Sequence, residues 1–180
     1  MGQPSWREIR RLQVPDRPAA LWTPALDYVT PAKLYRITVE PQAPPPAPQA
    51  GAQQAAAQQG GPQQGAPQQA QAQAVVPQDQ RWTPAGEQPT TADGNPALSR
   101  NGGLVIDGCA PGALIGKVGG STADLKPDKD KVILFSVGRH CVFSVTEAAK
   151  TGALYLCIND GREGITGVQG RLEVTICEAL

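Results

Sequence analysis

The sequence is short of the residues that many binding and catalytic sites use. Aromatic residues make up 4% of the 180 residues, and His140 is the single histidine. So few aromatic side chains argue against a platform on which nucleic-acid bases stack. The formal net charge is +0, so the basic face typical of nucleic-acid binders is not expected either. We therefore expect no nucleic-acid partner, and the length suits one domain of ordinary size.

Membrane, export and zinc signals are also missing. No run of about 18 apolar residues is present, so no transmembrane segment is expected. Residues 1–13 lack the apolar stretch of a classical signal peptide, which favours a cytoplasmic or non-classically exported protein. The four cysteines include no CxxC pair, so a zinc site is not expected. Cys157 and Cys177 lie in apolar strand patterns, where a reduced thiol packs as a small hydrophobe.

A catalytic set cannot be assembled from these residues. His140 is followed by Cys141, but neighbouring residues of a strand point to opposite faces and do not form a Cys–His pair. Nucleophilic catalysis needs a nucleophile, a base and an orienting acid within reach of one another. The sequence therefore predicts a protein that is not an enzyme.

A low-complexity tract is the clearest feature that is present. Residues 41–77 contain no charged and no aromatic residue, and Pro, Ala and Gln dominate them. Such a composition cannot bury enough apolar surface to offset the entropy of ordering. We expect a flexible, disordered insertion over residues 41–80, between N-terminal strands at 14–40 and the main part of the domain at 81–180. Residues 1–13 are expected to be an N-terminal tail.

Both flanks of this tract carry short segments of β-type. Tyr35, Ile37 and Val39 alternate with polar residues, as in a half-buried strand. After the tract come five more such segments, at 112–119, 131–137, 141–145, 152–158 and 170–176. Turn residues separate them, and no helical periodicity longer than two turns appears. The pattern predicts an all-β fold, an antiparallel jelly-roll-like β-sandwich interrupted by the insertion.

The last two segments have the pattern of a hairpin over residues 152–176. Each has three apolar residues on one face of the expected strand: Leu154, Leu156 and Ile158, then Leu172, Val174 and Ile176. We expect these two apolar faces to meet in the core. A polar loop containing Asp160 connects them.

Three segments taken together resemble a known family. They read GALIGKVGG (112–120), TGALYLCINDG (151–161) and GVQGRLEVTI (167–176). They look like the bacterial calcium-dependent galactophilic lectins of the PA-IL type and the wider galactose-binding-like β-sandwich domains. Two weaker pieces extend the resemblance, WTPAGE (82–87) and WTPALDYVTPAKLYRITV (22–39).

The resemblance implies a ligand site in the loops at one end of the sandwich. Asp160 would bind calcium and touch the sugar, with Asn159 beside it, and the backbone of Gly164 would be a second calcium ligand. The family's sugar-holding His and Gln fall near Thr90 and Asp93, so Asp93 is a further candidate for ligand contact.

The sequence departs from the family where calcium needs ligands. Two asparagines late in the family's loop correspond to Gly167 and Val168. Calcium takes six to eight oxygen ligands, and the carboxylate of Asp160 alone cannot supply them. An Asn-Asp pair at a strand end is also typical of an Asx-turn, in which the side chain bonds to nearby backbone. Calcium at Asp160 is therefore possible but doubtful.

Two functions stay open. The first is a non-enzymatic, lectin-like binding module that engages a glycan or another ligand through its loops. The second is an architectural or accessory subunit of a larger assembly, which uses the same fold for protein–protein contacts and has lost the sugar site. Homo-oligomerisation is compatible with either.

Overall fold

The fold is almost entirely β. In a computed structural model of the chain, the described residues are 4–39, 82–83, 88–98 and 103–180. They form ten β-strands, one short helix, α1 (Arg162–Thr166), and one 3-10 turn, η1 (Ala148–Lys150). The all-β prediction is confirmed. The expected insertion at 41–80 lies outside the described residues.

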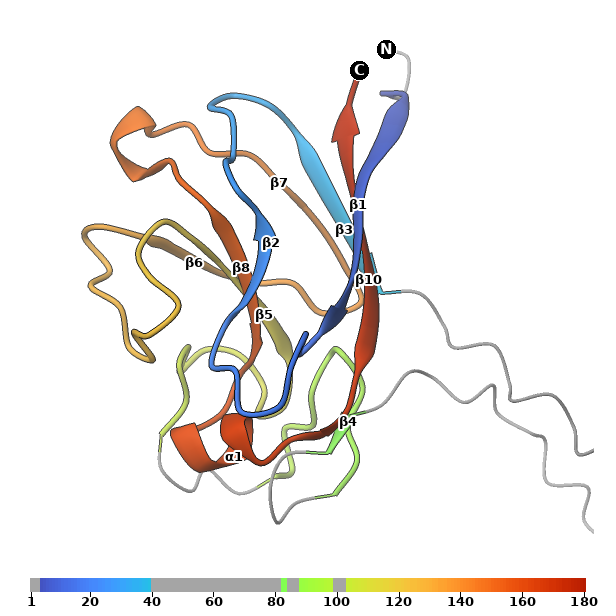
Figure 1. The fold of residues 1–180 in the computed structure, drawn as a ribbon, viewed down its shortest axis with the longest axis vertical. Helices are drawn as coiled ribbons and strands as arrows, with labels where there is room; N and C mark the ends of the chain where they lie inside the picture. The colour runs from blue at the N-terminus through green and yellow to red at the C-terminus, as the bar shows by residue number, and fades with distance from the viewer. Residues whose placement is uncertain (1–3, 40–81, 84–87, 99–102) are drawn as a thin grey trace, which may run out of the picture.

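Two antiparallel four-stranded sheets lie against each other (Figure 1). Sheet A has the order β1 (Trp6–Val14), β10 (Leu172–Ala179), β3 (Tyr35–Val39), β7 (His140–Phe143). Sheet B has the order β2 (Thr23–Leu26), β8 (Leu154–Ile158), β5 (Leu114–Val118), β6 (Ile133–Ser136). A small third ladder joins β4 (Trp82–Thr83) to β9 (Gln169–Gly170).

The core lies between the two sheets. The apolar faces of β8 and β10 are both buried in it, as the alternation predicts. An aromatic group spans the layers, because Phe135 of sheet B lies 4.7 Å from Phe143 of sheet A, which stacks on Tyr35. Gly116 leaves room for this group, since a Cβ there would come within 2.4 Å of the Phe135 ring. The core thus ties the two sheets into one sandwich.

The hairpin prediction for residues 152–176 is wrong in its topology. β8 pairs with β2 and β5 in sheet B, whereas β10 pairs with β1 and β3 in sheet A. The segment between them, which includes α1, crosses from one sheet to the other. The two apolar faces therefore share the core as facing layers and not as paired strands.

The prediction of a tail over residues 1–13 is also wrong, because residues 6–14 form β1 and pair with β10 along its length. Arginines and a glutamate hide this strand in the sequence, and charged side chains are usual on an edge strand. A register shift between Glu8 and Arg10 also breaks the simple alternation.

No helix in the described part of the chain is long and apolar enough to cross a bilayer.

Candidate functional site

Short parts of the segments that carry the lectin resemblance meet at one end of the sandwich, beside α1 (Figure 1): residues 82–83, 112–113, 159–161 and 169–170. Trp82 is buried there and pairs with Gly170 of β9. Its indole Nε1 donates a hydrogen bond to the carbonyl of Gly112 (2.7 Å), and its backbone exchanges two hydrogen bonds with Thr90. Segments distant in sequence are thus held around one buried indole.

Asn159 serves as an internal bracket at this end. The side chain is 0% exposed and makes four hydrogen bonds to backbone. Its Oδ1 accepts from the N–H of Ile106, and its Nδ2 donates to the carbonyls of Ile106, Cys109 and Ala110. We correct the expectation that Asn159 contacts a ligand, because the buried amide is already occupied in holding the loop at 106–110.

Asp93 is exposed but engaged by a neighbouring turn. Its Oδ1 accepts from the Arg139 N–H (2.9 Å), and its Oδ2 pairs with the Arg139 guanidinium (2.6 Å). Gly138 makes this approach possible: its φ is +60°, and a Cβ there would lie 2.8 Å from Oδ1. Asp93 therefore anchors the turn that leads into β7, and its contact with a ligand stays a prediction.

Asp160 and Gly164 are brought together, as the resemblance implies. The Asp160 carboxylate lies over the first turn of α1 and accepts from the Gly161 N–H (2.7 Å). A Cβ on Gly164 would fall 2.0 Å from Oδ2 of Asp160, so only glycine allows this packing. The carboxylate therefore bonds to backbone directly beside it, at the residue that precedes α1. Within the described residues, no group of three or more His, Cys, Asp or Glu side chains is placed to hold a metal ion.

A buried lysine with a lowered pKa lies in sheet B, and it was not among the site residues expected from the sequence. Lys117 of β5 is 0% exposed and points away from sheet A. Its ammonium lies 4.3 Å from the ring of Trp22 and 5.1 Å from that of Tyr155, and it donates to the Ser121 carbonyl (2.5 Å). The Trp22 indole in turn donates to the Asp124 carbonyl. A charged residue inside the apolar run 112–119 was the available signal.

Burial lowers the pKa of Lys117, while the carboxylate of Asp124 and the thiol of Cys157 oppose that shift. A lysine with a lowered pKa is a candidate nucleophile in general. Here two aromatic rings and a backbone carbonyl enclose the amine, and no substrate can reach it in this conformation. Lys117 therefore anchors the segment at 120–124 over the outer face of sheet B, with a cation–π contribution from each ring.

The four cysteines are free thiols. Cys157 and Cys177 are buried, as predicted, and Cys109 and Cys141 are partly buried. Desolvation raises the pKa of the Cys157 and Cys141 thiols. A thiol held protonated is a poor nucleophile, so neither of these two residues has the properties of a catalytic cysteine.

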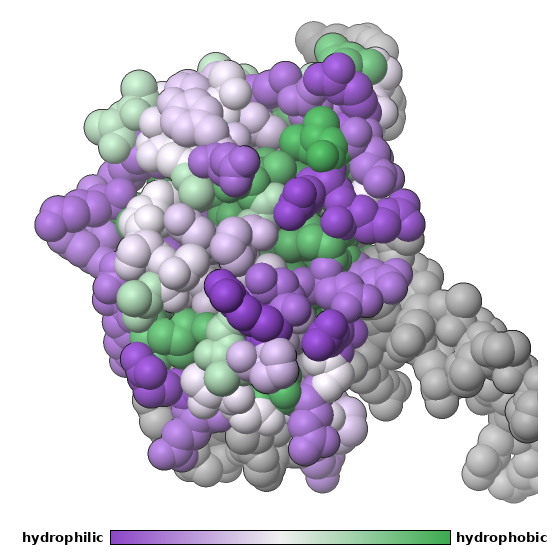
Figure 2. Space-filling model, in the orientation of Figure 1, coloured by the Kyte–Doolittle hydropathy of each residue, from purple (hydrophilic) through white to green (hydrophobic). Residues whose placement is uncertain are grey.

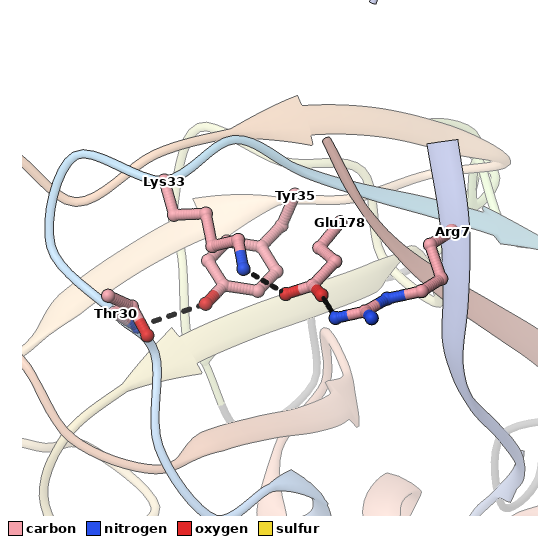
Figure 3. A network of polar contacts seen from close by, with 5 residues as sticks. All are labelled: Arg7, Thr30, Lys33, Tyr35 and Glu178. Atoms are coloured by element: carbon pink, nitrogen blue, oxygen red, sulfur yellow. Dashed lines mark hydrogen bonds and ion pairs between the residues drawn. The ribbon is translucent and has the colours of Figure 1, made fainter. Parts of the chain in front are cut away.

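At the end of the sandwich where the chain termini lie, Glu178 connects three segments (Figure 3). Its carboxylate pairs with the Arg7 guanidinium and with the Lys33 ammonium, and these contacts hold its pKa below the usual range. Beside it, the Tyr35 hydroxyl accepts from the Thr30 N–H (3.0 Å). The network ties β1 and the segment before β3 to the last strand.

The outer face of sheet A is open around Arg36. We call Trp6, Leu34, Arg36, Val142 and Cys177 the open face. Alternation and register place all five on the side turned away from sheet B. Leu34 is 41% exposed and Val142 46% exposed. Large apolar side chains this exposed on one sheet face suit contact with another molecule.

Among the described residues, Arg36 has no acidic partner on this face. Its guanidinium lies over the Trp6 ring at 4.8 Å, and its Nη2 donates to the Cys177 sulfur at 3.7 Å. Its Nε is buried and has no hydrogen-bond partner in the described part of the chain. A half-buried arginine without a carboxylate or carbonyl is under-satisfied, since buried guanidinium groups are normally paired.

A scan of the chain against models of known protein families gave no match, and a search among curated proteins gave none either. The function is therefore argued from the geometry described above.

Proposed function

We propose that this chain is a non-enzymatic binding module that docks on a protein partner through the open face. The observation that carries the proposal is the guanidinium of Arg36, whose buried Nε has no partner among the described residues, close to the exposed side chains of Leu34 and Val142. The partner would present a carboxylate to Arg36 and apolar side chains to its two neighbours. Arginine and aromatic residues are the side chains most enriched at interface hot spots, which fits Arg36 stacked on Trp6.

The alternative, a glycan-binding module of the lectin type, has less support in the geometry. Asn159 is buried in a structural role, and Asp93 is bound to Arg139. Of the candidates that the resemblance implied, Asp160 with Gly164 is the pair that lies together. One carboxylate bonded to the neighbouring backbone provides neither a calcium shell nor the several hydrogen-bond partners that a sugar needs.

Matched substitutions test the docking surface. Val142→Glu and Leu34→Glu each place a charge on the open face. The control is Tyr28→Glu, which places a charge on an exposed large side chain (57% exposed) between β2 and β3. Native mass spectrometry of the tagged full chain, purified from its own cells, would measure a stoichiometric complex. We expect both open-face variants to weaken it about tenfold or more, and the Tyr28 variant to retain it.

Two outcomes would overturn the proposal. One is a complex that survives both open-face substitutions. The other is the absence of a stoichiometric protein complex together with glycan binding on an array, lost when calcium is removed or when Asp160 is changed to Ala. The second outcome would restore the lectin interpretation.

A further inference from the structure

A cavity of about 390 Å³ opens beside the free edge of β6, on the sheet B side of the molecule. Its volume falls in the usual range of small-molecule sites. Four parts of the fold line it: the segment at 105–106, the loop before β6, β6 itself, and η1 with the residue preceding it. It does not share a residue with the open face and is independent of the proposed protein contact.

The floor of the cavity is aliphatic. Five branched aliphatic residues form it: Val105, Ile106, Val132, Ile133 and Leu134. Val105 and Val132 are buried, and the other three are partly buried and pack on the core. An aliphatic floor without an aromatic ring suits a flexible hydrocarbon chain, because contact depends on buried apolar area and not on ring stacking.

The rim is charged, with a net positive sign. Lys129, Lys150 and Glu147 all line the cavity, which gives two positive charges and one negative charge. The ammonium of Lys150 pairs with the Glu147 carboxylate at 3.2 Å. Lys129 forms no ion pair with any described residue, so its charge remains available at the mouth of the cavity. The rim thus complements a single negative charge at one end of an apolar ligand.

From this charge and this floor we propose that the cavity binds a single-chain amphiphile with an anionic head, of the medium-chain fatty carboxylate type. The hydrocarbon chain lies on the aliphatic residues that line the cavity at the edge of β6, and the carboxylate meets Lys129. A cationic amphiphile would face two lysines, and a fully polar anion would leave the floor uncovered. The groove between β1 and β2 is a weaker candidate: it is lined in part by Arg10 and Asp27, and Figure 2 shows only small apolar patches on that face.

Titration calorimetry on the full chain with three probes tests the proposal. Dodecanoate should bind more tightly than octanoate, by up to about fourfold for each methylene that reaches the floor. Dodecanol, which has the same chain and no charge, should bind about two- to fivefold more weakly than dodecanoate, as expected for an exposed ion pair. Amide NMR shifts caused by dodecanoate should concentrate in β6 and at residues 104–106.

Two charge reversals provide the matched variants. Lys129→Glu changes an exposed side chain at the mouth and should remove the preference for dodecanoate over dodecanol without loss of folding. Arg162→Glu, at an exposed position of α1 at the other end of the sandwich from the chain termini, should leave both affinities unchanged. Binding that ignores chain length, a carboxylate preference that survives Lys129→Glu, or NMR shifts centred away from β6 would each overturn the assignment.

Discussion

The central strand β5 of sheet B is buried on both of its faces, whereas the edge strand β7 of sheet A leaves its outward-facing residues exposed. All five residues of β5 in sheet B are buried, including Lys117. In β7 of sheet A, by contrast, partly buried and exposed residues alternate. The difference comes from the segments around them. Trp22 and residues 120–124 cover the outer side of β5 and hold Lys117, and nothing comparable is described over Arg36 and Val142.

The comparison of Lys117 with Arg36 explains why burial of a cation does not by itself mark a binding surface. The charge of Lys117 is matched inside the chain, by two rings and a carbonyl. The charge of Arg36 is matched by one ring and a thiol, and its Nε has no acceptor. A buried polar atom without a partner needs an explanation, and among the described residues that atom is the Nε of Arg36 on sheet A. Contact with another molecule at the outer face of this sheet would provide the missing acceptor.

The largest contrast is expected between two tryptophans. Trp22→Ala removes a buried ring that covers Lys117 and should lower the free energy of unfolding by about 3–5 kcal/mol. Trp6→Ala removes a ring from the open face and should cost about 0.5–1 kcal/mol, the value of a surface cation–π contact. Urea unfolding of both variants measures the difference. Equal losses would show that sheet A is covered as fully as sheet B.

Next in size is the Asn159 bracket. Asn159→Ala removes four hydrogen bonds and leaves buried backbone groups unpaired, so a loss of about 2–4 kcal/mol is expected. Asn95→Ala is the control, because that side chain makes one hydrogen bond in an exposed turn and should cost about 0.5 kcal/mol. Thermal or urea unfolding is the measurement. A small loss of stability in Asn159→Ala would mean that the side chain is not needed to hold the loop, and Asn159 would again be a candidate for ligand contact.

Lys117→Met should change how the free energy of unfolding depends on pH more than it changes that free energy near pH 7. Near pH 7 we expect a change within about 1 kcal/mol, because replacing a buried charge by an apolar group is often neutral or stabilising. The folded-state pKa of Lys117 lies below its unfolded value of 10.5, so the unfolded state binds more protons between those two values. Wild-type stability should therefore gain from Lys117 as the pH rises through that window. In the methionine variant that gain should vanish, and an unchanged slope would contradict the burial of the charge.

The smallest effect is expected at Glu178. Arg7 and Lys33 lower its folded-state pKa below the ordinary 4.5, so its stabilising contribution is present above that value and is lost as the pH falls below it. The wild type should therefore exceed Glu178→Gln in stability at neutral pH, and the two should converge in acid. Unfolding curves at several pH values would show this. A constant difference across the range would mean that the ion pairs do not contribute.

The sequence predicts the sandwich well because its central strands are short, apolar and separated by turns. The alternation of Leu154, Leu156 and Ile158 marks a buried face regardless of partners. The alternation does not identify which strands pair with each other. Alternation is identical for a hairpin and for two facing strands, so the division of β8 and β10 between two sheets was not visible. The edge strand β1 was hidden by its charges.

The candidate site was predicted in position more than in role. Asp160 and Gly164 lie close together, and their role as calcium ligands stays a prediction. The structural roles of Asn159 and Asp93 depend on segments 46 to 53 residues away in the chain, and no local pattern reports such contacts. Arg36 was read only as the polar half of an alternation, because its lack of an acidic partner is a property of the assembled sheet.

The most direct test of where this chain binds is hydroxyl-radical footprinting of the purified complex against the free chain. Oxidation of Trp6, His140 and Val142 should fall in the complex, because all three lie on the outer side of sheet A. Oxidation of Tyr28 should stay the same. Protection confined to residues 160–170 or to Tyr28, with the open face unchanged, would contradict the proposed mode of binding.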